Sequence, residues 1–429
     1  MRHIYMDANA TTPLLPEVFE AMRPFWIEHF GNASSIHQQG QYARAAVDHA
    51  RESIAKLLHC RTSEIVFTSG GTESDNLALF GTLSEGDHLI TTAIEHHAVL
   101  HAAESVAARN IEVTFLPCTP HGLIESSALE AALRPNTKLV SIMYANNEKG
   151  VIQPIAELAR IAHTAGALFH TDAVQAAGKL PLDLGPRGPL KDVDLLSISG
   201  HKIHAPKGIG VLFVRRSVRL APMLHGGSHE RQRRAGTENV TGVVGLGKAA
   251  ELAQHWLAND SAPTNPGAGA GAPHLDSEMS DSGERPTAPA PLDPANSPYD
   301  LAALRDRLEQ GILAQVEECG VNGGGAPRVA NTTNLYFDHV EAEALVIALD
   351  LKGLAVSGGS ACQSGATEPS HVLTAMGLSP ARARASIRFS LSKLTTEEEV
   401  DEALKLIPAA VARLRELSPT WRRTVEIVA

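Results

Sequence analysis

The sequence predicts an α/β protein with one large, mostly parallel sheet and a smaller α+β domain. Seven short apolar runs alternate with stretches of helical periodicity between residues 64 and 215. This alternation is typical of a parallel sheet with helices on both faces. A segment rich in Pro, Gly, Ala and Ser then interrupts the pattern. Beyond it the helices and strands follow a different order, which indicates the second domain.

The apolar runs supply the seven expected strands of the large sheet. They are EIVFTS (64–69), HLITTAI (88–94), EVTFLP (112–117), KLVSIMYA (138–145), ALFHTDAV (167–174), DLLSISG (194–200) and GVLFVR (210–215). The intervening helices are expected over SDNLALFGTL (74–83), HAVLHAAESVAARN (97–110) and PIAELARIAHTAG (154–166), among other pieces. We place the large domain that these elements build at residues 14–252.

Residues 259–298 stand apart because they contain almost no aliphatic side chains. Such a segment cannot bury enough apolar surface to offset its chain entropy. It is either a domain linker or a disordered insertion. The flanks at 242–258 and 299–316 both have the apolar periodicity of helices, which favours the insertion.

The smaller domain is expected after this insertion. Its elements are a helix over 299–316, a polar strand RVANTTNLYF (328–337), a helix EAEALVIALD (341–350), a strand RASIRFSLS (384–392) and a last helix. The first residues of the chain are expected to pack with these elements. We therefore assign residues 1–13 and 253–429 to this domain.

The totals exclude several classes of protein. The formal net charge is −11 and there is no long basic run, which argues against a nucleic-acid partner. The N-terminus lacks an apolar signal core, and no apolar run reaches the roughly 20 residues of a membrane helix. The four cysteines include no CxxC pair, which fits a reducing compartment. We expect a soluble, cytoplasmic protein.

A glycine-rich turn follows the first strand and begins a helix. Ligands of open α/β sheets bind at the carboxyl ends of the strands, and Gly71 and Thr72 stand at such an end. The N–H groups of a helix N-terminus attract an anion, although an ordinary capped helix start has the same pattern. The turn lacks the GK[ST] of a nucleotide-binding loop.

Later strands end in side chains that carry chemistry, at Asn147, Asp172 and Lys202. A lysine at the end of an apolar strand is costly unless it is paired or used covalently, and desolvation makes it a Schiff-base nucleophile. An acidic residue one strand earlier would face the ring nitrogen of pyridoxal phosphate. The alternative for Lys202 is a surface-loop lysine. His96, after strand 88–94, would be able to stack on the ring and relay protons.

Three further features are ambiguous on their own. His97 and His101 are spaced like a metal-binding pair, but no HExxH and no third ligand accompany them. Helix-surface histidines are therefore favoured, and no metal site is expected. Residues 225–240 form a basic, glycine-rich loop that suits a solvated face, an anion site or a dimer contact. Cys362 is a lone thiol in the Gly/Ser-rich segment 357–371, which we expect to be a mobile loop.

Seven of these motifs together resemble one known family. They are YMDANATTP, FTSGGTESDNLAL, MYANNEKGVIQP, HTDAVQAAGKLPLDL, SISGHKIHAPKGIGVLF, HGGSHERQRRAGTENV and SGGSACQSGATEPSHVL. In this order they closely resemble the cysteine desulfurases. These are pyridoxal-phosphate (PLP) enzymes with the class V aminotransferase fold, which belongs to fold type I of the PLP-dependent enzymes. The resemblance runs from Tyr5 to about Val400 without the insertion. The SACQSG loop is similar to the group I type, which serves iron–sulfur cluster assembly.

The resemblance implies a role for each site residue. Lys202 would form the Schiff base with the cofactor and move the substrate's α-proton, His96 would stack on the ring, and Cys362 would take the sulfur. Asp172 would contact the ring nitrogen of the cofactor, and Gln175 would contact the ring hydroxyl near Asn147. The phosphate would be bound by Gly71, Thr72, Ser199 and His201, and Thr237 would reach the phosphate of the neighbouring subunit. The substrate carboxylate would be bound by Arg388, Asn32 and Asn147.

The implied activity is the conversion of L-cysteine to L-alanine by a homodimer. Sulfur would become a persulfide on Cys362, which a base such as His96 would activate. It would then pass to an acceptor, namely a cluster scaffold, a tRNA-thiolation protein or a thiamine-pathway carrier, and Cys362 would be able to contact a nascent cluster. Another class V enzyme, such as a selenocysteine lyase or an aminotransferase, and a non-catalytic scaffold are the alternatives. Ala33 and Lys393 depart from the family pattern, outside the implied catalytic set.

Overall fold

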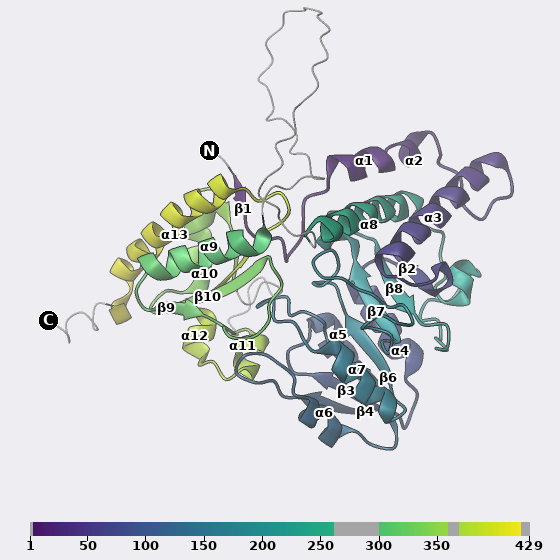
Figure 1. Ribbon diagram of the computed structural model, residues 1–429, viewed down its shortest axis with the longest axis horizontal. Helices are drawn as coiled ribbons and strands as arrows, with labels where there is room; N and C mark the ends of the chain where they lie inside the picture. The colour runs from purple at the N-terminus through teal and green to yellow at the C-terminus, as the bar shows by residue number, and fades with distance from the viewer. Residues whose placement is uncertain (1–2, 261–299, 359–368, 422–429) are drawn as a thin grey trace, which may run out of the picture.

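A computed structural model describes residues 3–260, 300–358 and 369–421 (Figure 1). The predicted fold class is confirmed, since a seven-stranded, mostly parallel sheet is covered by helices and a smaller antiparallel sheet with its own helices lies beside it. Most of the predicted insertion at 259–298 lies outside the described residues. So does the centre of the predicted cysteine loop at 357–371, including Cys362.

The larger sheet contains the seven strands that the apolar runs predict. In spatial order they are β2 (Ile65–Thr68), β8 (Gly210–Val214), β7 (Leu195–Ser199), β6 (Leu168–Asp172), β5 (Thr137–Ser141), β3 (His88–Thr92) and β4 (Glu112–Leu116). The pairs from β7 to β4 are parallel, and β8 runs antiparallel to both of its neighbours. Every strand of this sheet except β8 therefore ends at the same edge.

Alternate residues of each strand face opposite layers of helices. Val66 packs with α4 (Gly71–Thr82) and α5 (His97–Ala107), whereas Ile65 and Phe67 face the other layer. That layer contains α3 (Gln38–Leu57), α6 (Ser126–Ala132), α7 (Ile155–Thr164) and α8 (Val240–Asp260), with α1 (Pro16–Met22) and α2 (Pro24–Ile27) against α8. Both faces are covered, so nearly every residue of these strands outside β4 is buried.

The smaller sheet is antiparallel and has four strands. Their order is β12 (Ser357–Gly358), β13 (Ser386–Ser390), β10 (Thr332–Phe337) and β9 (Cys319–Val321). Its core is shared with α9 (Leu301–Gln315), α10 (Ala342–Asp350) and α13 (Glu397–Leu417), which lie over the sheet in Figure 1. α11 (His371–Ala375) and α12 (Pro380–Arg384) lead into β13. The three-residue strand β9 was not predicted, because so short a run has no readable period.

The N-terminal strand joins this smaller part of the chain. β1 (Ile4–Tyr5) pairs in parallel with β11 (Leu354–Ala355), and Ile4 and Met6 lie in the smaller core. The helix α8 packs in the larger core as far as Trp256, so position 252, where we place the boundary, lies inside a helix. The division at 252 and 253 remains a prediction.

Three short 3-10 helices complete the described elements, namely η1 (Thr62–Glu64), η2 (Gly200–Lys202) and η3 (His229–Gln232). Across the three described ranges, no helix combines the length and the apolar character that crossing a membrane requires.

Candidate active site

A cavity of about 610 Å³ opens where the parallel strands of the larger sheet end. It brings together most of the site residues predicted from the sequence, which are Gly71, Thr72, His96, Asn147, Asp172, Gln175, Ser199, His201, Lys202 and Arg388. Residues 9–11 of the N-terminal segment also line it. The wall is thus built from both sheets, because Arg388 lies on β13 of the smaller one.

The turn after β2 presents the N-terminus of α4 to this cavity. The N-cap residue is Gly70, which has no side chain to accept from the first N–H groups of the helix, so an anion is able to take that place. A Cβ atom on Gly71 would lie 2.8 Å from a methyl group of Val174, so a side chain here would force a shift of the turn or of Val174. Glu73 in the same turn is paired with Arg234 at 2.8 Å, which offsets its negative charge near the anion site.

Lys202 lies in η2, directly after β7. Its Nζ donates hydrogen bonds to the backbone carbonyls of Asn9 at 2.6 Å and Ala10 at 2.8 Å. The neighbouring His201 ring contacts the hydroxyl of Thr11 at 3.1 Å. The N-terminal segment therefore folds over the strand end and keeps the lysine amine inside the cavity.

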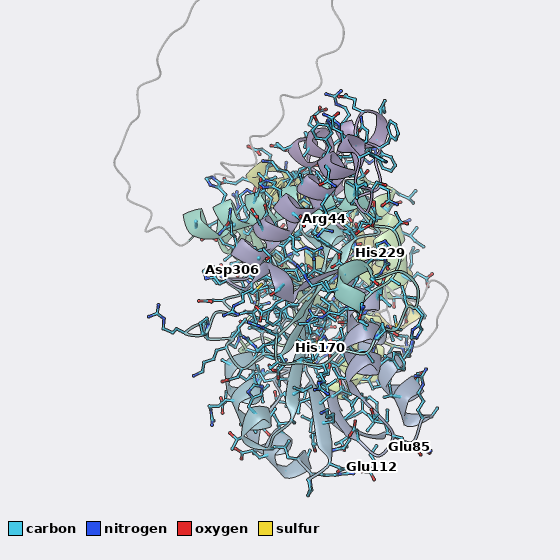
Figure 2. The ribbon with its side chains drawn as sticks, turned by 90° about the vertical axis from the view of Figure 1, so that its right-hand side faces the viewer. Arg44, Glu85, Glu112, His170, His229 and Asp306 are labelled. Atoms are coloured by element: carbon cyan, nitrogen blue, oxygen red, sulfur yellow. The ribbon has the colours of Figure 1, made fainter. Side chains whose placement is uncertain are left out.

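Three buried carboxyl groups lie at or beside the cavity. Burial raises the pKa of Asp172 to about 6 and the pKa of Glu95 to about 8. Burial, with Asp172 close by, also raises the pKa of Asp75 well above its usual range. Asp75 lies 3.6 Å from His170, whose ring sits among the strands of the larger sheet (Figure 2). The positive charge of Lys202 favours the ionised form of Asp172. Of the three carboxyl groups, Asp172 is therefore the one suited to carry a negative charge.

His96 is the N-cap of α5. Its Nδ1 accepts a hydrogen bond of 3.1 Å from the backbone N–H of Ala98. Burial, followed by the charge of Lys202, lowers the pKa of His96 to about 4. The imidazole is therefore neutral at physiological pH and carries its proton on Nε2.

Three predicted site residues are not among the described residues that line the cavity. Asn32 and Thr237 are both exposed, and neither is among the described residues that line the cavity. The role predicted for Thr237 concerns a neighbouring subunit, and the roles of both residues remain predictions. Cys362 lies outside the described residues.

Several side chains at this site were not identified from the sequence. Asn9 and Asp75 line the cavity, and Glu95 and Lys179 interact electrostatically with residues that do. Asp75 and Glu95 each come shortly after a predicted strand. Their spacing does not distinguish them from the acidic residues that are common near helix N-termini. Asn9 reaches the cavity only because the N-terminal segment crosses from the smaller sheet to the larger one.

Comparison with known proteins agrees with this geometry. The family model described as Aminotransferase class-V matches residues 4–265 and 296–403. A cysteine desulfurase of Trichormus azollae is 46% identical over 422 residues, which cover 98% of this chain and 95% of that protein. A solved NifS-like protein has a TM-score of 0.80 at 33% identity, covering 96% of this chain and 99% of its own.

A second solved structure, of SspA in complex with cysteine, has a TM-score of 0.72 at 34% identity. It covers 92% of this chain and 100% of its own. Both the family model and the relatives thus span nearly all of the elements that build the cavity. The chain belongs to the class V aminotransferase family and, within it, to the cysteine desulfurases.

Proposed function

We propose that this chain converts L-cysteine to L-alanine with pyridoxal 5'-phosphate and carries the sulfur as a persulfide on Cys362. The observation that carries the proposal is the convergence of Lys202, Asp172 and Arg388 on one cavity. An amine nucleophile, an acidic partner for a pyridine ring and a guanidinium for a carboxylate are the groups that amino-acid chemistry on this cofactor requires.

The residues present fit the cofactor. The glycine turn at 70–72, with Ser199 and His201, would hold the phosphate, Asp172 would face the ring nitrogen, and Lys202 would bind the aldehyde carbon. When bound, the cofactor supplies an electron sink that stabilises negative charge at the α-carbon of the substrate. The ionised form of Asp172, which Lys202 favours, suits a protonated ring nitrogen.

Lys202 would take the α-proton of the substrate at Nζ. The amine has acceptors at 2.6 and 2.8 Å on Asn9 and Ala10. When the substrate displaces Lys202 from the cofactor, these backbone carbonyls would keep its amine at the cavity wall, where it is able to take the α-proton. Arg388 would bind the substrate carboxylate and so select an amino acid.

His96 would donate a hydrogen bond to the substrate. Its Nδ1 is engaged by the N–H of Ala98, so the neutral ring donates from Nε2. This differs from the base role toward Cys362 that the family resemblance suggests, since Nδ1 already accepts a hydrogen bond and Nε2 already carries the proton. We infer that the Lys202 ammonium, formed when Lys202 takes the α-proton, gives a proton to the substrate carbon that loses sulfur, which completes L-alanine.

The ends of the cysteine loop support a role for Cys362 at this cavity. On one side, Ser357 of β12 pairs with Arg388. On the other, Ser370 donates a hydrogen bond of 2.5 Å to Glu148 and His371 bonds to the backbone carbonyl of Glu95 at 2.9 Å. Cys362 follows Gly358, the last residue of β12, by four positions, so an extended chain allows it a reach of about 13 Å.

We propose that the active protein is a homodimer. Four large apolar side chains that follow one another along the chain are strongly exposed, namely Trp26 at 66%, Ile27 at 76%, Phe30 at 73% and Ile36 at 94%. An apolar patch of this kind marks a protein interface. The exposed Thr237 would then complete the phosphate site of the partner subunit. We further propose a cytoplasmic setting, whose reducing conditions would keep Cys362 a thiol, and a protein acceptor for the sulfur, such as an iron–sulfur scaffold.

The test is to incubate the purified protein, loaded with pyridoxal phosphate, with L-cysteine. Mass spectrometry of the Cys362 peptide should show one added sulfur atom, and alanine should form in parallel. Cys362→Ala should bind cofactor normally and give no persulfide at any cysteine. Cys60→Ala, which removes a described free thiol, should behave like the unmodified chain.

Three outcomes would contradict parts of the proposal. A keto acid as the product, without alanine, would indicate an aminotransferase. Full turnover by Cys362→Ala with release of sulfide would remove Cys362 from the transfer step. Unchanged cofactor absorption after Lys202→Ala, compared with Lys207→Ala as a second cavity lysine, would overturn the lysine assignment.

A further inference from the structure

Lys179 is a second lysine close to the proposed cofactor site, and the reaction described above does not use it. Its Nζ donates hydrogen bonds to Oε1 of Gln175 at 2.8 Å and to Oδ1 of Asn9 at 3.3 Å. Both acceptors are neutral amide oxygens. Within the described part of the chain, no carboxylate lies within ion-pair distance of this amine.

Two contacts set which way the amide of Gln175 points, and Lys179 makes one of them. An ammonium group has three donors and no acceptor, so the atom that faces it must be the oxygen of the amide. The Nε2 of Gln175 is thereby turned to the other side, where one N–H donates to the backbone carbonyl of Asn9 at 3.0 Å. Gln175 is only 4% exposed and lines the cavity, which leaves its second N–H as a donor there.

A second contact of Lys179 reaches Asn9. The Oδ1 of Asn9 accepts from Lys179 at 3.3 Å and from Nδ2 of Asn331 at 3.1 Å, and its Nδ2 donates to the carbonyl of Asn147 at 3.0 Å and the hydroxyl of Thr332 at 2.9 Å. The backbone carbonyl of Asn9 is also the acceptor for Lys202 at 2.6 Å. Lys179 thus contacts two side-chain amides of residues whose other groups contact the cavity or the proposed Schiff-base lysine.

We propose that Lys179 is a positioning residue that turns the N–H group of Gln175 toward the cavity. The site then offers a hydrogen-bond donor, and not an acceptor, to a ligand oxygen such as the ring hydroxyl of pyridoxal phosphate. The inference rests on the proposed function, because it concerns the same cavity. Burial, followed by the charges of Lys202 and Arg388, lowers the pKa of Lys179 to about 7, so the ammonium form prevails below that pH.

A double-mutant cycle on cofactor affinity tests this role. Cofactor-free protein is titrated with pyridoxal phosphate at pH 6.5, using the parent chain, Lys179→Met, Gln175→Ala and the double variant. Lys179→Met should weaken binding about tenfold, because the amide of Gln175 loses its partner at Oε1 and is held only by its bond to the Asn9 carbonyl. In the Gln175→Ala background the same change should alter affinity less than about twofold, since Lys179 acts through that amide.

The controls separate positioning from folding. Lys179→Arg keeps a donor without an acceptor and should stay within about threefold of the parent affinity. Lys138→Met removes an exposed lysine from β5 and should change nothing. If Lys179→Met does not fold, as judged by thermal unfolding, Lys179→Ala takes its place in the cycle.

Two results would overturn the inference. One is parent-like affinity in Lys179→Met. The other is an equal loss in both backgrounds, which would make Lys179 a structural residue independent of Gln175. If the parent chain itself bound no pyridoxal phosphate, the proposed function would fail first, and the two failures are thereby distinguishable.

Discussion

The guanidinium of Arg388 donates a hydrogen bond of 2.7 Å to the carboxylate of Asp7, which lies 381 positions earlier in the chain. A second bond of 3.1 Å runs from Arg388 to the backbone carbonyl of Asn147. Only 4% of the Arg388 side chain is exposed, and within the described residues its Nε is buried without a hydrogen-bond partner. Arg388 is therefore already oriented when a substrate carboxylate arrives, which lowers the entropic cost of binding.

We predict that Arg388→Lys raises the KM for L-cysteine by about 30- to 100-fold, with a smaller effect on kcat. Lysine has a single ammonium group, so it cannot contact Asp7, Asn147 and a carboxylate with the geometry of a planar fork. Steady-state kinetics with alanine as the measured product checks this. Arg384→Lys, an exposed position four residues earlier, is the matched control. A normal KM in Arg388→Lys would place the carboxylate elsewhere.

The buried carboxyl group of Glu95 should make the free energy of unfolding depend on pH. Its Oε1 accepts hydrogen bonds from Thr92 and the N–H of Met143, whereas in the described structure its Oε2 is buried without a partner. Burial raises its pKa from 4.5 to about 8. The folded state therefore keeps a proton that the unfolded chain loses between pH 4.5 and 8. The free energy of unfolding contributed by this group falls as the pH rises through that window.

Glu95→Gln should remove this dependence, because the amide imitates the protonated acid. We expect the variant to exceed the parent chain by about 2 kcal/mol in unfolding free energy at pH 8 and to differ little at pH 4. Urea denaturation of both cofactor-free proteins at each pH measures the difference. Glu85→Gln, at an exposed position labelled in Figure 2, should show no such change with pH. A variant that is less stable than the parent at pH 8 would mean that Glu95 is ionised in the fold.

The fold and much of the site were predictable from local sequence. The strands of the larger sheet other than β4 are buried on both faces and lie in apolar runs, and the turn or strand end that follows five of the seven runs contributes residues to the cavity. Asp172 and Lys202 were found in this way. Their positions depend only on where each strand ends.

What could not be predicted depends on contacts between distant segments. Asn9 and Asp7 reach the site because β1 pairs with β11 and Asp7 forms a bridge to Ser390 of β13, and no local period signals a contact between residues 381 positions apart. Lys179 acquires its partners from Gln175 and from the same N-terminal crossing. The tautomer of His96 depends on the cap of α5. Such orientations follow from tertiary geometry, which the sequence pattern does not specify.

The buried ion pair between Arg51 and Glu230 predicts a large stability effect. The two side chains are 6% and 4% exposed and approach to 2.7 Å, and Glu230 also accepts from the N–H of Phe67 at 3.1 Å. Glu230 has a left-handed φ of 48°, a conformation that is costly unless contacts hold it. Its segment lies against α3, where Arg44 and His229 line one pocket (Figure 2).

Glu230→Ala should lower the free energy of unfolding by about 3–5 kcal/mol, because Arg51 is left as an unpaired buried charge. Glu20→Ala breaks an ion pair with Arg23 in which both side chains are 60% exposed, and it should cost less than about 1 kcal/mol. Chemical denaturation of the two variants provides the comparison. Equal losses would show that water reaches the Arg51 side chain despite its burial.

The glycine turn before α4 allows the proposed phosphate site to be tested without changing any charge. A Cβ atom on Gly71 would lie 2.8 Å from Val174, and both residues line the cavity. The turn or Val174 must therefore shift, and a shift of the turn moves the first N–H groups of α4 away from the anion. We expect Gly71→Ala to weaken pyridoxal phosphate binding about 10- to 100-fold.

The matched control is Gly324→Ala, whose Cβ would meet only Val321 at 3.9 Å and which should bind the cofactor normally. Thermal unfolding of the same two variants separates a loss of the anion site from a loss of the fold. An unchanged affinity would place the phosphate away from this turn.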